Sequence, residues 1–501
     1  MSLSEKLGPS RAKELAAFLL KVEFPAPTRR IMEPLLEMLV GGQSFDLSQN
    51  YLIREPAALL LLIELIPSLS EELQLDLWST LGAMLHQCLH NISSCHNIGM
   101  TEKCLDYLAK TKNPKIANHI GSVLELLSGY SLSVKHLKSI LSYLYNGQSD
   151  TTWAPHSVLL ISLLNNVTIN RTPDAFFSFS GGHGSVFALP PVSKWPTQTG
   201  FTVSMWIRSE QTYDSQRDYY KPILYWFRSG RGSGYSAHFV GSTLVLETVG
   251  KQIKKPQTHP VDHVFHSFQW YMVTVVYTAH RLRSSEVQCY VDGVLSLTAE
   301  VTLPLQEEIY DKCFLGGNHV ATPDSVFQGQ MAALYIWRVP LSRDSIASLY
   351  KLGSNYRSQF KFEAEVDMPL TMKEQKLLFD GSLSNSLIIS YNAKAVDGQL
   401  CLEASPTEGH SSVFAHSPHA TMLEGVEPVL TTSIHSALHS LGGIQVSPLH
   451  LSGDLLSVIF DFLRYLSKSP YSEELIQPLV VQLLFNASLW IRASKKVRVY
   501  C

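Results

Sequence analysis

An eight-residue stretch, Phe201–Arg208, constrains the fold most, because its side chains alternate strictly along the chain. One set points to one side: Phe201, Val203, Met205 and Ile207. A period of two predicts a strand with one face in a core, and Trp206 on the opposite, mostly polar face is the exception. Residues 271–277 alternate in the same way, and Val287–Val291 leads into Asp292-Gly293, a signal for a type I′ turn. Several short strands ended by Gly, Pro or Asp predict an antiparallel sandwich.

Residues 1–170 have helical patterns instead. Apolar residues recur at helical spacing, and we expect helices at Leu15–Val22, at Ile31–Leu39 before Gly41-Gly42, and at Ala57–Ile66, Leu73–Leu89, Ile116–Leu127, Val134–Leu144 and Val158–Leu164. Helices with short turns favour an α-solenoid of the armadillo or HEAT type. A compact helical bundle is the alternative.

The predicted fold is therefore α+β and multidomain. We expect the sandwich at 171–356, with a closing strand at Phe327–Trp337 and a short helix at Arg343–Leu352 ended by Gly353. Residues 357–430 have mixed patterns typical of a connector, with candidate strands at Leu387–Tyr391 and Gln399–Leu402. Residues 431–501 return to helical spacing, with Asp454 as an N-cap and a last helix at Ile476–Leu489, and predict the start of a second armadillo-like region.

Charge and cysteine content exclude several classes of protein. The 501 residues carry a net charge of −3 with 17% charged side chains. The chain therefore lacks the overall positive charge that attracts nucleic acid or an anionic membrane. The seven cysteines are scattered and odd in number, which does not indicate a disulfide framework. Met1–Lys6 lacks the apolar run of a signal peptide. Without such a peptide, we do not expect N-glycosylation at the sequon Asn91-Ile-Ser93. We expect a cytosolic chain.

Two histidine-rich tracts invite a metal assignment. The first holds six candidate ligands: His86, Cys88, His90, Cys95, His96 and Cys104. His86 and His90 stand one helical turn apart, but no C-x-x-C accompanies them and Cys88 would point off that face. The second holds His416, His419, His435 and His439, with no carboxylate or thiolate ligand evident nearby. We expect structural roles for both tracts, no metal site and no cofactor.

Sandwiches of this kind can be glycosidases or lectins, and both classes were weighed. The string Glu363–Leu370 has Leu370 where a glycosidase E-x-D-x-x-E pattern needs its last Glu, so hydrolysis is not expected. Asp292, Asn318 and Asp324 form no calcium ligand set.

A metal-free sugar face remains open, carried by one of four aromatic residues: Tyr219, Tyr220, Tyr225 or Trp226. Core burial of these aromatics is the ordinary alternative. The glycine-rich segments 181–184 and 230–234 are expected to be hairpin turns, because strands rather than helices follow them. No catalytic residue is predicted.

Long strings of this sequence resemble the N-terminal part of the neurobeachin family, which includes the lipopolysaccharide-responsive beige-like anchor protein. The strings in the sandwich are Val186–Pro191, Lys194–Pro196, Gly200–Thr202, Gly234–Gly241, Trp270–Met272, Tyr310–Gly316 and Tyr391–Ala395. Others lie before and after it: Leu39–Gly42, Phe45–Leu47, His416–Ala420, Ser433–His435 and Gly442–Gln445.

The resemblance implies a large scaffold for vesicle trafficking and membrane-protein targeting, peripheral on Golgi and endosomal membranes. It also implies kinase anchoring, since family members tether the regulatory subunit of protein kinase A through a later region. The family's C-terminal pleckstrin-homology-like, BEACH and WD40 domains match nothing here, so we expect a fragment, a partial gene model or a short form that competes with the full-length scaffold. The expected function is a non-catalytic protein-interaction module; the alternative is a glycan-binding lectin module at vesicle membranes.

Overall fold

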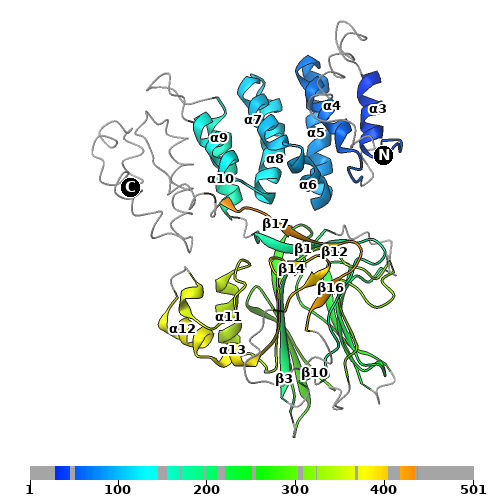
Figure 1. Cartoon of the computed structure of the whole chain (residues 1–501), viewed down its shortest axis with the longest axis vertical. Helices are drawn as coiled ribbons and strands as arrows, with labels where there is room; N and C mark the ends of the chain where they lie inside the picture. Colours follow the sequence, from blue (N-terminus) through cyan, green and yellow to red (C-terminus); the bar gives the residue numbers. More distant parts are fainter. Residues whose placement is uncertain are drawn as a thin grey trace, which may run out of the picture. The chain divides into compact units, whose positions relative to one another are not determined.

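The computed structural model describes residues 29–45, 51–144, 155–169, 172–193, 195–196, 199–210, 220–250, 255–280, 282–302, 309–322, 324–366, 370–403, 418–434 and 437. The chain divides into two compact units (Figure 1). One contains the chain up to Asn170 and again from Thr431; the other spans Arg171–Leu430. Each unit is described by itself.

The helical unit is a series of helices packed on one another (Figure 1). They are α3 (Arg29–Leu39), α4 (Pro56–Leu65), α5 (Glu71–Gln87), α6 (Leu89–Asn97), α7 (Met100–Lys110), α8 (Pro114–Tyr130), α9 (Val134–Leu144) and α10 (Ser157–Ile169). Every helix predicted within the described residues is present; the one expected at Leu15–Val22 lies outside them. The sequence patterns missed α6 and α7.

Local signals explain where these helices begin. The Ser70 hydroxyl accepts a hydrogen bond from the Leu73 amide at the start of α5, and Asn113 caps α8 in the same way. Pro56 and Pro114 stand in the first turns of α4 and α8, where a missing N–H costs nothing. Buried aliphatic and aromatic side chains from successive helices, Trp78 among them, form one core.

The chain returns to this core after the sandwich. The Thr432 carbonyl accepts a hydrogen bond from the Leu132 amide at 2.8 Å, and the Ser131 hydroxyl accepts one from the Thr432 amide at 3.2 Å. Ile434 and Ala437 are buried among the side chains of the first helices. The helical unit is therefore built from chain on both sides of the sandwich. The helices expected after Asp454 and at Ile476–Leu489 lie outside the described residues.

The second unit is a sandwich of two antiparallel sheets. The eight-stranded sheet has the order β10-β9-β8-β3-β12-β1-β17, with β13 paired to β12. The nine-stranded sheet has the order β14-β15-β16-β2-β11-β4-β5-β6-β7. The strands are β1 (Ala175–Ser180), β2 (Phe187–Ala188), β3 (Gly200–Ser209), β4 (Ile223–Arg228), β5 (Gly234–Val240), β6 (Thr243–Val249), β7 (Gln257–Pro260), β8 (Trp270–Thr278), β9 (Ser285–Val291), β10 (Val294–Val301), β11 (Lys312–Leu315), β12 (Gln328–Trp337), β13 (Leu387–Tyr391), β14 (Val396–Asp397), β15 (Leu400–Cys401), β16 (Ala420–Met422) and β17 (Val426–Leu430).

Residues 357–430, expected as a connector, contribute strands to both sheets. The candidate strands at Leu387–Tyr391 and Gln399–Leu402 are present as β13 and β15. The last strand, β17, pairs with the first, β1, so that Leu430 lies opposite Ala175. The chain thus enters and leaves the sandwich on neighbouring strands, as inserted domains commonly do.

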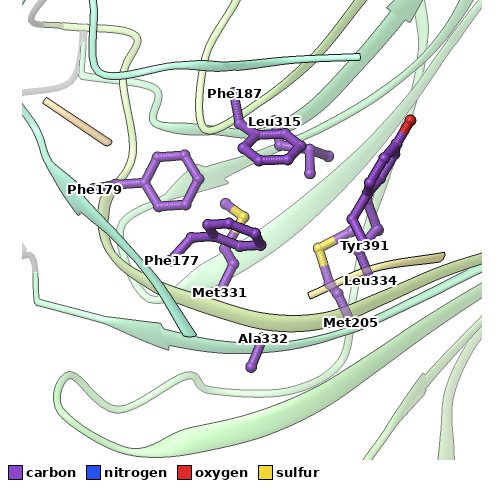
Figure 2. A pocket seen from close by; sticks show the side chains of 9 residues that line it. All are labelled: Phe177, Phe179, Phe187, Met205, Leu315, Met331, Ala332, Leu334 and Tyr391. Atoms are coloured by element: carbon purple, nitrogen blue, oxygen red, sulfur yellow. The ribbon is translucent and has the colours of Figure 1, made fainter. Parts of the chain in front are cut away.

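Aromatic and aliphatic side chains from both sheets fill the space between them. Figure 2 shows the centre of this core, where Phe187 and Leu315 of one sheet face Phe177, Met331 and Met205 of the other. The gap among them has a volume of about 10 Å³ and an apolar lining. A space of this size is a packing defect rather than a ligand site, since even a single water needs polar partners.

Helix α11 (Arg343–Leu352) packs on the outer face of the eight-stranded sheet at β3. Helices α12 (Met372–Phe379) and α13 (Ser382–Ser386) follow it, α12 packed on α11 and α13 on α12 (Figure 1). The Trp206 ring stacks on Tyr350 of α11 with centroids 5.7 Å apart, which explains why a large aromatic residue stands on the otherwise polar side of β3. The predicted helix Arg343–Leu352 and the Asp292-Gly293 turn are confirmed.

Candidate interaction face on the nine-stranded sheet

The outward side chains of β4, like those of β3, include a tryptophan and an arginine. The alternation in β4 turns Tyr225 and Phe227 into the core, where the Tyr225 hydroxyl pairs with that of Tyr277 at 3.0 Å. It turns Trp226 and Arg228 to the outer face. Neighbouring strands add the outward residues Phe314 and Lys312 of β11, Ser236 and His238 of β5, and Glu247 of β6. We call this surface the Trp226–Arg228 face.

Arg228 is the centre of this face. Its Nη2 donates to Glu247 Oε1 at 2.6 Å and to Ser236 Oγ at 2.9 Å. Its guanidinium carbon lies 4.4 Å from the centre of the Trp226 ring, a cation–π contact. Only 3% of the Arg228 surface is exposed, and this burial lowers the pKa of its guanidinium, while Glu247 opposes the effect. A guanidinium stays charged even so.

Two buried donors of this face have no acceptor within the part of the chain that the structure describes. They are Nη1 of Arg228 and Nε1 of Trp226. A buried donor without an acceptor costs about 1–3 kcal/mol, and such groups are rare in native structures. Phe314 lies beside Trp226 on the adjacent strand and is half-buried. Both donors are enclosed in the folded chain, and Phe314 packs against the small cluster of Val186, Ala321 and Val326.

Further cations surround the centre. Lys312 lies opposite Arg228 on β11, and the positive charge of Lys221 acts on His238. Burial lowers the pKa of His238; Glu247 works against this shift and Lys221 adds to it. Glu247 is the carboxylate that compensates these charges directly. Among the described residues of this face, no nucleophile is paired with a base.

The structure separates the four aromatic candidates for a sugar face. Tyr225 lies in the core, Trp226 lies on the outer face, Tyr220 is half-buried, and Tyr219 lies outside the described residues. Sequence reasoning thus found one residue of the face. It missed Arg228 and Glu247, whose pairing depends on the register of three strands.

The structure distributes the first histidine and cysteine tract over helices α5, α6 and α7 and the residue Cys88. The extended residue Cys88 separates the end of α5 from the start of α6. His86 and His90 therefore do not share a helical face, contrary to what their spacing indicated. His90 Nε2 lies 3.1 Å from the Ile53 carbonyl. Cys95 is fully buried; this burial, with a contribution from Cys88, raises its pKa to about 12. Within the described ranges, no group of three or more His, Cys, Asp or Glu side chains could hold a metal ion.

A different polar cluster joins four helices of the helical unit. Glu102 Oε1 of α7 lies 3.1 Å from both Lys135 Nζ and His136 Nε2 of α9. The His96 ring of α6 lies 5.6 Å from His136 and 5.5 Å from Tyr130 of α8. The residues of this cluster come from four helices, so a search for short-range spacing patterns in the sequence does not find it.

The remaining candidates have local roles. Glu365 accepts from the Tyr356 hydroxyl at 2.7 Å in a short 3₁₀ helix, Glu363–Glu365, and Asp367 lies outside the described residues. Asp292 accepts from the Met272 amide, and Asn318 accepts from the amides that follow it. His419 Nδ1 accepts from the Glu403 amide; His416, His435 and His439 lie outside the described residues.

The two glycine-rich segments have different outcomes. Residues 230–234 form the predicted hairpin turn between β4 and β5. The prediction for 181–184 was wrong, because this segment links β1 of one sheet to β2 of the other. Small, flexible residues serve both kinds of connection, so the sequence does not distinguish them.

Comparisons with known families cover most of the chain. Residues 8–167 match the neurobeachin alpha solenoid region, and residues 412–447 and 445–500 match the DUF4704 alpha solenoid region of neurobeachin and BDCP. Residues 180–347 match the concanavalin A-like lectin/glucanase superfamily. The chain belongs to the neurobeachin family. It corresponds to the family's N-terminal region, and the predicted order of solenoid, concanavalin A-like sandwich and second helical region is confirmed.

Individual relatives show how the family extends beyond these residues. A putative neurobeachin homolog of Caenorhabditis elegans is 30% identical over 94% of this chain, and BEACH domain-containing protein B of Arabidopsis thaliana is 24% identical over 84%. The chain spans 21% and 16% of their lengths. A SAP-like pentraxin from Limulus polyphemus is similar over 35% of this chain and 82% of its own, with 14% identity and a TM-score of 0.27, which carries no further argument. Among the helices described, none has the length and apolarity needed to span a bilayer.

Proposed function

We propose that this chain is a non-catalytic protein-interaction module of a neurobeachin-like scaffold that acts in vesicle trafficking, membrane-protein targeting and kinase anchoring. Family membership supports the scaffold role, and the trafficking and anchoring roles come from the family resemblance. The observation that supports interaction most directly is the row of half-buried side chains on the outward side of the nine-stranded sheet. It includes Trp226, His238 and Glu247 on three neighbouring strands.

The proposal that the module does not catalyse rests on the reactive groups. Buried thiols with raised pKa values, such as that of Cys95, are poor nucleophiles because they stay protonated. The acidic candidates Asp292 and Glu365 serve turns and loops. Peripheral attachment to Golgi and endosomal membranes would then come from bound partners.

Cross-linking tests the interaction role. The full 501-residue chain, immobilised, would be incubated with a cell lysate and treated with a lysine-reactive cross-linker before mass spectrometry. We expect reproducible cross-links from the sandwich lysines to a small set of proteins, absent from a control of heat-unfolded chain. If the folded chain retains no protein beyond this control at physiological salt, the proposed function is wrong.

A glycan-binding lectin module is the second candidate, because Trp226 and Phe314 place two half-buried aromatic rings side by side. Arg228 already lies over the Trp226 ring, which reduces the surface that a sugar could stack on. Isothermal titration with a panel of oligosaccharides decides between the two. The lectin function requires millimolar or tighter binding that Trp226→Ala removes; the interaction module predicts no heat of binding.

A further inference from the structure

We propose that the nine-stranded sheet binds a basic amphipathic helix of a partner protein, along a row of outward side chains near its β14 edge. This inference rests on the proposed interaction function and names the kind of partner. Four neighbouring strands contribute one residue each to the row, which we call the Leu400–Phe314 row: Leu400 of β15, Thr421 of β16, Ala188 of β2 and Phe314 of β11.

The registers of the strands place these four side chains side by side on the outer face. Leu400 lies opposite Thr421, Thr421 lies opposite Ala188, and Ala188 lies opposite Phe314. Successive side chains of a strand point to opposite faces of the sheet. The row therefore faces outward, because residues next to its members in sequence are buried in the core between the sheets: Cys401, Met422, Phe187 and Leu315.

The row is exposed at its β15 and β16 end. Leu400 is 43% exposed, and Leu402 stands two residues further along on the same side of the chain. Leu423 follows β16 and stands diagonally across from Leu400, since Thr421 is the residue opposite Leu400. Leu402 and Leu423 are 38% and 39% exposed. Neighbouring exposed apolar side chains with a polar rim are typical of protein interaction sites.

The rim of this exposed end is acidic. Asp397 of β14 lies opposite Leu400, so its carboxylate projects on the same outer face, and it is exposed. The described stretches that carry β14, β15 and β16 are residues 395–403 and 418–425. They hold three carboxylates and no lysine or arginine. Basic side chains of a partner would therefore meet complementary charge beside the leucines.

The cations closest to the row do not cancel this charge. Lys394, which precedes the first of these stretches, lies 3.5 Å from Asp174. Lys312 belongs to the far end of the row, two residues before Phe314, where it lies opposite Arg228 and is half-buried. The acidic rim and the exposed leucines thus coincide at β15 and β16.

A helix fits this surface better than an added strand does. The edge strand beside the row is β14, and its two residues offer little backbone for strand addition. The row runs across the strands, and three steps of about 4.8 Å between neighbouring strands give it a length of about 14 Å. Residues three to four positions apart on a helix lie about 5 Å apart along its axis. Apolar side chains on one face of a helix would therefore meet successive strands of the row.

Fluorescence anisotropy with the full chain tests the proposal. The probe is a fluorescein-labelled peptide of about 15 residues, with leucine on one helical face and lysine and alanine elsewhere. One control peptide has the same composition in an order that spreads the leucines around the helix, and a second has glutamate in place of lysine. We expect binding of the leucine–lysine peptide alone, weakened by added salt.

Variants of the row locate the binding site. Leu400→Ser and Leu423→Ser should each weaken binding about fivefold, because each removes apolar surface that the peptide would cover. Asp397→Lys should weaken it about threefold and reduce the effect of salt. All three positions are exposed, so these variants should melt like the wild type. Leu295→Ser on β10 of the other sheet is the matched control: Leu295 is 39% exposed, and its replacement should leave binding unchanged.

Each other outcome overturns the proposal. It is wrong if the leucine–lysine peptide does not bind, if either control peptide binds equally well, or if both leucine variants of the row bind like the wild type. It is also wrong if Leu295→Ser weakens binding as much as they do. Dimers of the chain in sedimentation velocity that Leu400→Ser removes would assign the row to a second copy of this chain instead.

The cross-linking experiment separates this inference from the proposed function. If Leu400→Ser retains the same lysate proteins as the wild type, this inference fails while the interaction function stands. If the folded wild-type chain retains no protein, the proposed function itself fails.

Discussion

Replacing Asn91 by alanine should destabilise the helical unit more than any surface change. Asn91 of α6 is fully buried and joins three segments of the chain. Its Oδ1 accepts from the Ile53 amide at 2.8 Å, and its Nδ2 donates to the carbonyls of Tyr51 and Met84, both at 2.8 Å. The side-chain amide thus joins the extended segment that precedes α4 to α5 and α6.

The magnitude follows from the groups left behind. Asn91→Ala leaves one buried N–H and two buried carbonyls without partners, and each such group costs about 1–3 kcal/mol. A carbonyl tolerates the loss better than an N–H, so we expect about 3–5 kcal/mol in total, at the upper end for single substitutions. The same geometry precludes a glycan at the Asn91 sequon in the folded protein, since both polar atoms of the amide are used.

Hydrogen exchange with peptide-level mass spectrometry is the assay, because a chain with two units does not unfold in one step. A loss of 3 kcal/mol corresponds to exchange about 100-fold faster in peptides from α4, α5 and α6. Asn118→Ala, on the exposed side of α8, is the matched control and should change exchange by less than about threefold. If Asn91→Ala exchanges like this control, the buried-partner argument is refuted.

Two further predictions concern one glycine and the histidine cluster. Gly200 has φ +108° and an added Cβ would lie 1.9 Å from the Tyr277 carbonyl oxygen, so Gly200→Ala should cost about 3 kcal/mol or more, seen as earlier loss of near-ultraviolet circular dichroism on heating. Burial, then the charge of His136, lowers the pKa of His96, while Glu102 acts the other way. A lowered folded pKa means that stability present above about pH 6.5 is lost as the pH falls below it, so the melting temperature of the helical unit should drop between pH 7 and 5. His96→Gln should flatten this dependence, and an unchanged slope would contradict the prediction.

Strong periodicity made some elements predictable. The alternation in Phe201–Arg208 gave β3, and the spacing in Arg343–Leu352 with Gly353 gave the bounds of α11. Helix α6, by contrast, has the sequence LHNISSCHN, with few apolar residues and a polar buried Asn91, so its burial depends on partners elsewhere in the chain. Strands β2 and β14 have two residues each, too short for any alternation to show.

The candidate site was harder to predict than the fold. An aromatic pattern indicated Trp226, but Ser236 and Glu247, which accept hydrogen bonds from its neighbour Arg228, lie on other strands. Arg228 and Glu247 meet only because β5 pairs with β4 on one side and β6 on the other, which aligns Ser236 with Trp226 and Glu247 and places Arg228 two residues further along β4. Non-local registers of this kind are set by the whole sheet, so a single sequence does not display them.

The outward residues of the two sheets are alike in kind. On β3 they include Trp206, which stacks on Tyr350, and Arg208, whose Nη1 donates to Glu210 and Gln330. On β4 they are Trp226 and Arg228, whose Nη2 donates to Glu247 and Ser236. In both strands the guanidinium is buried or nearly so and pairs with a glutamate, which avoids the cost of an uncompensated buried charge. The alternation that turns a Trp and an Arg outward is visible in the sequence, whereas the carboxylate that each arginine meets depends on the fold around the strand.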